Sequence, residues 1–144
     1  MSPQDLTGAY TYRSFLNQPE PAPDFDSLRF GEAELSIAVA QDGSVTGTLA
    51  FPADPEASDR AFMDMTGRAT DGSPPTLELE GIGRTGTGTA DFDYKYVAYP
   101  APVFSDAVDQ RPTLVGTVMR AKPHGGAPAG VTASLIAVRR GDES

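Results

Sequence analysis

Apolar and polar residues alternate along much of this chain, the pattern of strands with one buried face. From Leu35 to Val39 every second residue is a large apolar one, and the pair Asp42-Gly43 follows. Asp-Gly between alternating segments is a strong signal for a tight hairpin turn. A second alternating segment then runs over 44–51. Helical spacing of apolar residues is absent over any useful length, so the pattern predicts an all-β protein.

Eight such segments follow one another, separated by turns rich in Gly, Pro and Asp. We expect strands at 8–16, 33–40, 44–51, 60–70, 76–84, 88–99, 112–121 and 130–140. The whole chain, residues 1–144, is expected to form a single domain. Glycines inside strands let a sheet coil sharply, which favours a closed antiparallel up-and-down β-barrel over two stacked sheets. These glycines are Gly47, Gly67, Gly81, Gly83 and Gly116.

Aromatic residues gather on one face of two of the expected strands. In segment 88–99, Phe92, Tyr94 and Tyr96 share a face, and the opposite face carries charged residues. Charges favour water, so the aromatic face is expected to point into the barrel. By the same alternation, Tyr10 and Tyr12 are placed inward on segment 8–16. The rings either line a ligand pocket or simply fill the barrel, and the sequence leaves both open.

In an up-and-down barrel the connections alternate between the two ends. Connections 17–32, 52–59, 85–87 and 122–129 then share one rim, and 41–43, 71–75 and 100–111 share the other. The first rim carries the longest connection, 17–32, and the single histidine, His124. Because barrel mouths are common ligand sites, this rim is the first candidate for function.

The charge and composition narrow the class of partner. The formal net charge is −9, which repels nucleic-acid phosphates and anionic lipid surfaces, so neither nucleic acid nor membrane is expected as a partner. Cysteine is absent, which excludes disulfides and thiolate metal sites and suits a reducing cytoplasm. The first residues have no basic segment or apolar core of a signal peptide, so a soluble cytoplasmic protein is expected.

Two residues are candidates for catalysis. His124 is interpreted most simply as an exposed loop residue, and the alternatives are a general base, a haem ligand or one ligand of a metal ion. Arg120 shares a strand face with Leu114 and Val118, so it points either into the barrel, where it would indicate an anion site, or outward to a surface salt bridge. No metal and no cofactor is expected, because His124 has no second histidine or cysteine to join it.

The run from Gly81 to Gly86 spells G-x-G-x-x-G, the letters of a dinucleotide-binding loop. That loop works only where a helix begins and directs its amides at a pyrophosphate. Here the chain continues into turn and strand, so the run is interpreted as a glycine-rich hairpin.

The layout resembles the calycin group, which includes lipocalins, fatty-acid-binding proteins and avidins. Gly8-Ala9-Tyr10 opens the first strand where lipocalins carry G-x-W, and Arg139 closes the last strand where they carry a basic residue packed over that Trp. Connection 17–32 resembles the lipocalin lid loop. The resemblance implies a barrel that holds a small apolar ligand.

Three functions are expected from these features. The first is binding of a small apolar or aromatic molecule by Tyr10, Tyr12, Phe92, Tyr94 and Tyr96, with connection 17–32 as a lid. The second is a small barrel enzyme of the cyclase or isomerase type, with His124 or a tyrosine as acid or base and Arg120 stabilising negative charge. The third is a non-catalytic interaction or accessory domain that uses connections 17–32 and 100–111. The oligomeric state is not indicated.

Overall fold

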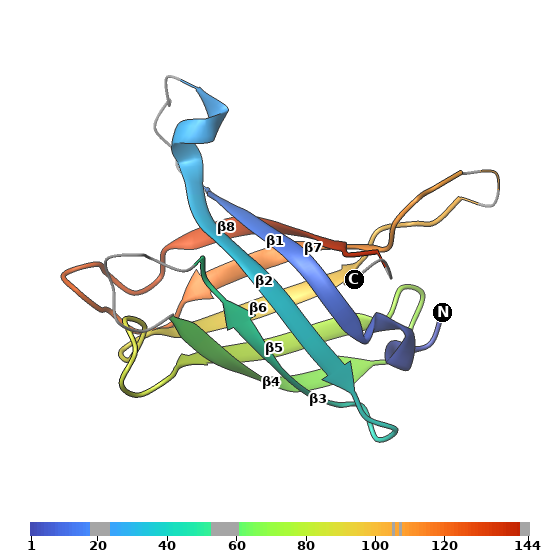
Figure 1. The fold of residues 1–144 in the computed structure, drawn as a ribbon, viewed down its shortest axis with the longest axis horizontal. Helices are drawn as coiled ribbons and strands as arrows, with labels where there is room; N and C mark the ends of the chain where they lie inside the picture. The colour runs from blue at the N-terminus through green and yellow to red at the C-terminus, as the bar shows by residue number, and fades with distance from the viewer. Residues whose placement is uncertain (18–23, 53–60, 105, 107, 142–144) are drawn as a thin grey trace.

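The chain forms a closed, antiparallel, up-and-down β-barrel, which confirms the predicted fold class (Figure 1). The computed structural model describes residues 1–17, 24–52, 61–104, 106 and 108–141. In this part of the chain eight strands pair in sequence order, and the last pairs back with the first. The elements are η1 (Pro3–Leu6), β1 (Gly8–Leu16), η2 (Phe25–Leu28), β2 (Arg29–Val39), β3 (Ser44–Ala50), β4 (Phe62–Thr70), β5 (Thr76–Gly83), β6 (Asp93–Pro100), β7 (Thr113–Arg120) and β8 (Thr132–Arg139).

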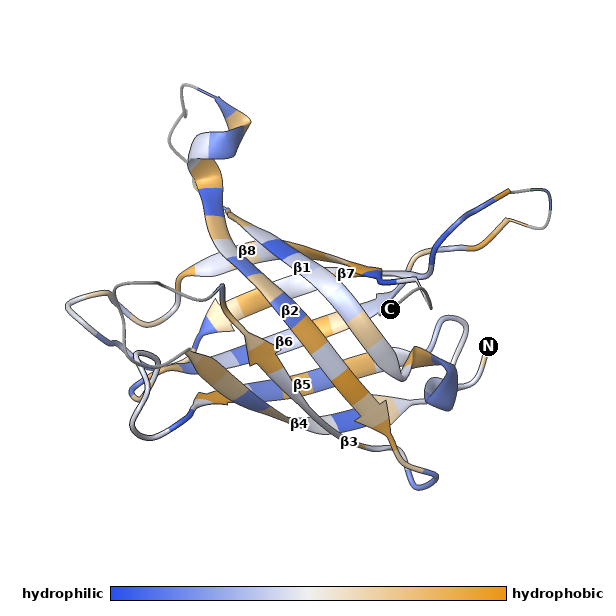
Figure 2. Cartoon of the chain, in the orientation of Figure 1, coloured by the Kyte–Doolittle hydropathy of each residue, from blue (hydrophilic) through white to orange (hydrophobic). Residues whose placement is uncertain are grey.

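The alternation in sequence becomes an inward and an outward face on every strand. Figure 2 shows hydrophobic and hydrophilic residues alternating along β2, the strand whose pattern is clearest. Leu35, Ile37 and Val39 are buried in the core, and β2 turns directly into β3 through the expected Asp42-Gly43 hairpin. Gly43 has a φ of 88°, a left-handed conformation that glycine adopts without steric cost. The hairpin signal and the register it fixes were therefore readable from the sequence.

Two strand starts differ from the expectation by four or more residues, and the other strand boundaries agree with it to within two. β2 begins at Arg29 rather than at 33, because its first residues continue the pairing with the end of β1, where Gly31 lies opposite Ser14. β6 begins at Asp93 rather than at 88, because successive backbone turns precede it, ending with the amide of Phe92 bonded to the carbonyl of Thr89. The G-x-G-x-x-G run lies on the end of β5 and in this turn, and no helix begins there.

Three glycines in strand interiors mark places where neighbouring strands approach closely. A Cβ atom on Gly67 would lie 1.9 Å from the carbonyl oxygen of Glu78, and one on Gly116 would lie 1.9 Å from that of Val97. Gly47 stands equally close to the backbone of β2. No other residue fits at these positions, in keeping with the coiling expected of a closed barrel.

One end of the barrel, which we call the closed end, is covered by η1. The loops after β2, β4 and β6 lie at this end, together with the N-terminus and the end of β8 (Figure 1). Leu6 of η1 is buried in the core, and the hydroxyl of Tyr10 donates a hydrogen bond of 2.6 Å to its carbonyl oxygen. The guanidinium of Arg139 donates to the same hydroxyl at 2.7 Å and lies 5.2 Å above the Tyr10 ring. The Arg139 charge therefore packs over the Tyr10 ring at the closed end.

Apolar side chains fill the half of the barrel nearest the closed end. They leave a space of about 20 Å³, room for a single water at most. The side chains around this space are Tyr12, Leu35, Leu49, Met65, Leu77, Leu79, Tyr96, Ala98, Leu114 and Leu135. Within the barrel interior, space large enough for a ligand must therefore lie nearer the opposite end.

The outer surface and loops carry the remaining expected features. In the connection between β6 and β7, Val103 and Phe104 are exposed, as the interaction hypothesis requires. Of connection 17–32, residues 18–23 lie outside the described residues, and η2 occupies part of the remainder, with the Phe25 ring against Phe15. Among the described residues, no helix has the length and apolar character needed to cross a membrane.

Candidate functional site

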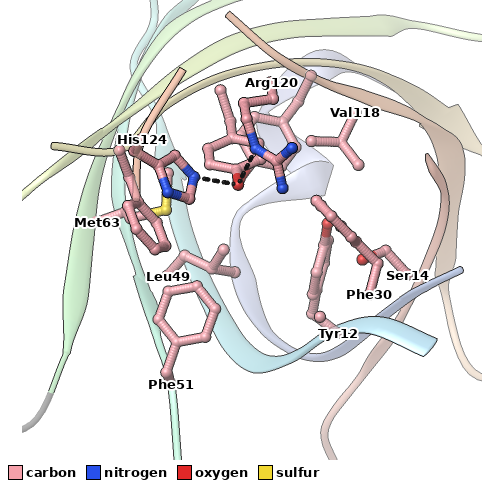
Figure 3. A pocket seen from close by; sticks show the side chains of 13 residues that line it. Tyr12, Ser14, Phe30, Leu49, Phe51, Met63, Val118, Arg120 and His124 are labelled. Atoms are coloured by element: carbon pink, nitrogen blue, oxygen red, sulfur yellow. Dashed lines mark hydrogen bonds between the residues drawn. The ribbon is translucent and has the colours of Figure 1, made fainter. Parts of the chain in front are cut away.

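A cavity of about 230 Å³ opens at the end of the barrel opposite η1, which we call the rim. The connections after β1, β3, β5 and β7 all lie at this end, as the up-and-down topology requires. Figure 3 shows its lining side chains converging from several strands. They are Tyr12, Ser14, Phe30, Gly31, Leu49, Phe51, Met63, Phe92, Tyr94, Tyr96, Val118, Arg120 and His124. Six of these are aromatic rings of Phe or Tyr, so the wall is mainly apolar with a few polar atoms.

β6 and β1 supply the tyrosines through strict alternation. Tyr94 and Tyr96 point inward from β6, and Tyr12 points inward from β1. The rings of Tyr12 and Tyr96 meet edge to face across the barrel, with centroids 6.4 Å apart. This geometry is favourable for aromatic pairs and fixes the cavity floor.

A hydrogen-bonded cluster joins three polar side chains at the mouth of the cavity. The hydroxyl of Tyr94 lies 2.8 Å from Nε2 of His124 and accepts a hydrogen bond of 3.1 Å from Nε of Arg120. Dashed lines in Figure 3 mark these two bonds, which connect His124 and Arg120 through one oxygen. A tyrosine from β6, an arginine from the end of β7 and a histidine from the loop after β7 thus meet at one point.

The connection between β7 and β8 holds His124 in this position. The backbone amides of His124 and Ala127 each donate to the other's carbonyl oxygen, which closes a two-residue hairpin. Its central residues, Gly125 and Gly126, have φ angles of 53° and 81°, the left-handed pair that such a turn requires. The imidazole then stacks on Phe92, with ring centroids 4.0 Å apart and planes at 21°. His124 is half-buried against the cavity, so its interpretation as an exposed loop residue was wrong.

The environment of His124 favours its neutral form. Burial lowers the pKa of the imidazole, and the neighbouring Arg120 guanidinium lowers it further, against a smaller opposing effect of Asp91. A neutral ring protonated on Nδ1 leaves Nε2 free to accept the proton of Tyr94, while the Tyr94 oxygen accepts from Arg120. This assignment is made from the hydrogen-bond network, and it satisfies all three groups at once.

Arg120 points into the barrel, which settles the choice that the sequence left open. Its side chain is 8% exposed, and one terminal nitrogen donates to the carbonyl oxygen of Pro128 at 3.1 Å. The guanidinium carbon lies 5.4 Å above the ring of Phe30, a cation–π contact. Among the described residues, the ion pairs do not include Arg120. A buried positive charge therefore borders the cavity.

The other phenols are held neutral by burial. Burial raises the pKa of Tyr12 to about 12, against a smaller opposing effect of Ser14, and burial raises that of Tyr96 well above its usual value. The Ser14 hydroxyl is buried and, within the described chain, has no hydrogen bond of good geometry, although the Tyr12 hydroxyl lies near it. These groups are polar atoms in an otherwise apolar wall.

The structure separates one sequence candidate from the others. Tyr12, Phe92, Tyr94, Tyr96, Arg120 and His124 all line the cavity. Tyr10 points inward too, but it lies at the closed end and bonds Leu6 and Arg139, so it belongs to the closure. Phe92 lies just before β6 rather than within it.

Several wall residues were not among the sequence candidates. Phe51 and Ser14 were within reach of the sequence, because they continue the inward faces of Leu49 and Tyr12 by alternation. Phe30 was hidden, because it was assigned to a loop, and it enters the wall only because β2 begins at Arg29.

Known proteins do not indicate a role for this cavity. Comparison of the chain with protein-family models, with curated proteins and with solved structures gave no match to any of them.

Proposed function

We propose that this barrel binds a small apolar or aromatic molecule in the rim cavity. The observation that carries the proposal is the cavity itself, about 230 Å³ of space walled mainly by aromatic and aliphatic side chains in a barrel that is otherwise filled. Ligand pockets have this composition, with apolar walls and a few placed polar groups. Burial of the ligand's apolar surface would supply most of the affinity.

The calycin-like closure supports the same proposal. Arg139 over Tyr10, with Gly8 beside it, reproduces at the closed end the arrangement that lipocalins make with a basic residue and a Trp. Connection 17–32, which resembles the lipocalin lid loop, follows β1 at the rim, and the cavity opens at that same end. Fold likeness alone does not name a ligand, so the cavity remains the main support.

The test is recovery and rebinding of a molecule. The protein is purified from its own host and analysed by native mass spectrometry, and a bound small molecule is then identified and titrated back. Val118→Phe places a ring in the cavity and is expected to weaken binding by more than about tenfold, since the site loses the volume the ligand needs. Val97→Phe is the matched control, because Val97 points outward and is 45% exposed. Equal binding by both variants, or no ligand carried by the unsubstituted protein, refutes the proposal.

A second candidate is acid–base catalysis of a cyclase or isomerase type. The observation that favours it is the meeting of His124, Tyr94 and Arg120 on one phenolic oxygen. Neutral His124 would accept the Tyr94 proton, and Arg120 would stabilise the phenolate, which gives a group able to take and return a substrate proton.

The recovered ligand also tests this candidate. It is incubated with the unsubstituted protein and with Tyr94→Phe, and the two solutions are compared by chromatography and NMR. An isomer of unchanged mass formed only by the unsubstituted protein supports catalysis. An unaltered ligand in both solutions leaves binding as the function.

A further inference from the structure

The guanidinium of Arg120 is a buried charge with no counter-charge among the residues that the structure describes. Its nitrogens donate to two neutral acceptors, the Tyr94 hydroxyl and the Pro128 carbonyl. Among the described residues, no carboxylate lies within 4.0 Å of it. Burying an unpaired ion is costly, and the cation–π contact with Phe30 offsets only part of that cost. An anion supplied from outside the protein would compensate the charge.

We propose that the ligand is a small aromatic carboxylate, a single ring bearing one acidic group, whose carboxylate pairs with Arg120. The inference rests on the proposed function, since it names the ligand class of the same cavity. Nη2 of Arg120 has no hydrogen bond to any described residue, and the guanidinium borders the cavity, as Figure 3 shows. A guanidinium with a free edge is the protein group best shaped to receive a carboxylate.

The size and walls of the cavity select a ring rather than a long chain. An apolar cavity of about 150 Å³ accepts benzene, so the 230 Å³ here suits a ring with a short acidic side chain. Phe30, Phe51 and Phe92 offer ring faces and edges for stacking. A long alkyl chain would have to continue beneath the cavity, where packed side chains leave only about 20 Å³.

The experiment compares molecules that differ only in the acidic group. Binding of hydrocinnamate, hydrocinnamyl alcohol and decanoate to the full chain is measured by isothermal titration calorimetry at neutral pH. Hydrocinnamate is expected to bind about 10- to 100-fold more tightly than the alcohol, the range for one charged hydrogen-bonded contact. Decanoate is expected to bind more weakly than hydrocinnamate.

Two variants test whether Arg120 causes the preference for the acid over the alcohol. Arg120→Met keeps the length of an apolar side chain and removes the charge, so it is expected to lose the preference for the acid while still binding the alcohol. Arg68→Met is the control, because it makes the same change of net charge at an exposed position outside the barrel. If Arg120→Met does not fold, the comparison of acid with alcohol in the unsubstituted protein still decides.

Each possible result overturns a different part of the inference. Equal binding of acid and alcohol overturns the carboxylate while leaving the proposed function in place. Decanoate binding as tightly as hydrocinnamate overturns the single ring. Absence of binding by all three compounds overturns the inference, and it refutes the proposed function as well if the protein from its own host also carries no small molecule. Retention of the acid preference in Arg120→Met overturns the assignment to Arg120.

Discussion

Replacing Tyr10 with Phe removes a single oxygen from the closed end of the barrel and leaves the ring in place. That oxygen donates to the carbonyl of Leu6 and accepts from Arg139, so it ties η1, β1 and β8 together. Tyr10 is fully buried, and the Arg139 nitrogen that donates to it also donates to the carbonyl oxygen of Asp5. The substitution therefore tests whether this end of the barrel is held by hydrogen bonding as well as by apolar packing.

The expected loss of stability follows from the two bonds. A neutral hydrogen bond contributes about 0.5–1.5 kcal/mol net, and one to a charged group about 1.5–3 kcal/mol. Tyr10→Phe is therefore expected to lower the free energy of unfolding by about 2–4 kcal/mol. For a chain of this length that corresponds to a fall in Tm of roughly 5–15 °C.

Tyr96→Phe is the matched control, because Tyr96 is equally aromatic and buried. Its hydroxyl forms no hydrogen bond to a described residue, so its removal is expected to change stability by less than about 0.5 kcal/mol. Urea unfolding of the three proteins is followed by circular dichroism and by tyrosine fluorescence, which no Trp obscures. If Tyr10→Phe costs no more than Tyr96→Phe, the hydroxyl does not hold the closure and the reasoning fails.

Three further outcomes are expected. Alkaline pH should destabilise the protein, because the pKa of Tyr12 in the folded state is raised to about 12 and the pKa of Tyr96 is raised too. Tyr12 contributes about 2–3 kcal/mol to the free energy of unfolding. This contribution is complete below the pKa of an unfolded tyrosine, near 10, and it is lost as the pH rises toward 12. Unfolding curves at increasing pH measure this, and a flat profile contradicts it. Gly67→Ala should prevent native folding or lower Tm sharply, since the new Cβ would lie 1.9 Å from a carbonyl oxygen. Gly88→Ala is the control, because Gly88 has open space around it, and its circular dichroism spectrum and Tm should match those of the unsubstituted protein. Leu6→Ala should cost about 2–5 kcal/mol in urea unfolding because it empties a core position, and a loss below about 1 kcal/mol would show that η1 does not seal the barrel.

The strands were readable from the sequence where the pattern is local. Alternation around Leu35 and the Asp42-Gly43 turn fixes a hairpin without reference to the rest of the chain. The inward glycines also predicted closure, since Gly67 and Gly116 stand where strands press together. The start of β2 was missed because pairing with the end of β1 extends the strand beyond its local pattern, and the start of β6 was missed because consecutive turns interrupt the pattern.

The candidate site was readable only in part. Alternation places Tyr94 and Tyr96 inward, but it cannot decide the face of Arg120, because both faces of β7 are partly apolar. His124 was judged exposed because the tight Gly125-Gly126 hairpin, which lays the ring against Phe92, becomes visible only when the two strands are paired. The meeting of His124 and Arg120 on the Tyr94 oxygen follows from the pairing of β6 with β7, which sets Tyr94 opposite Arg120, and from the loop that follows β7.

The two ends of the barrel are built from separate groups of residues. The rings and charges around the cavity share no hydrogen bond with Tyr10, Arg139 and η1. Effects of substitutions at such distant, unconnected sites add almost independently. Substitutions at Phe30, Phe51, Phe92 and His124 are thus expected to change the cavity wall while the closed end keeps the barrel folded, so this chain should tolerate a library of variants confined to those four positions.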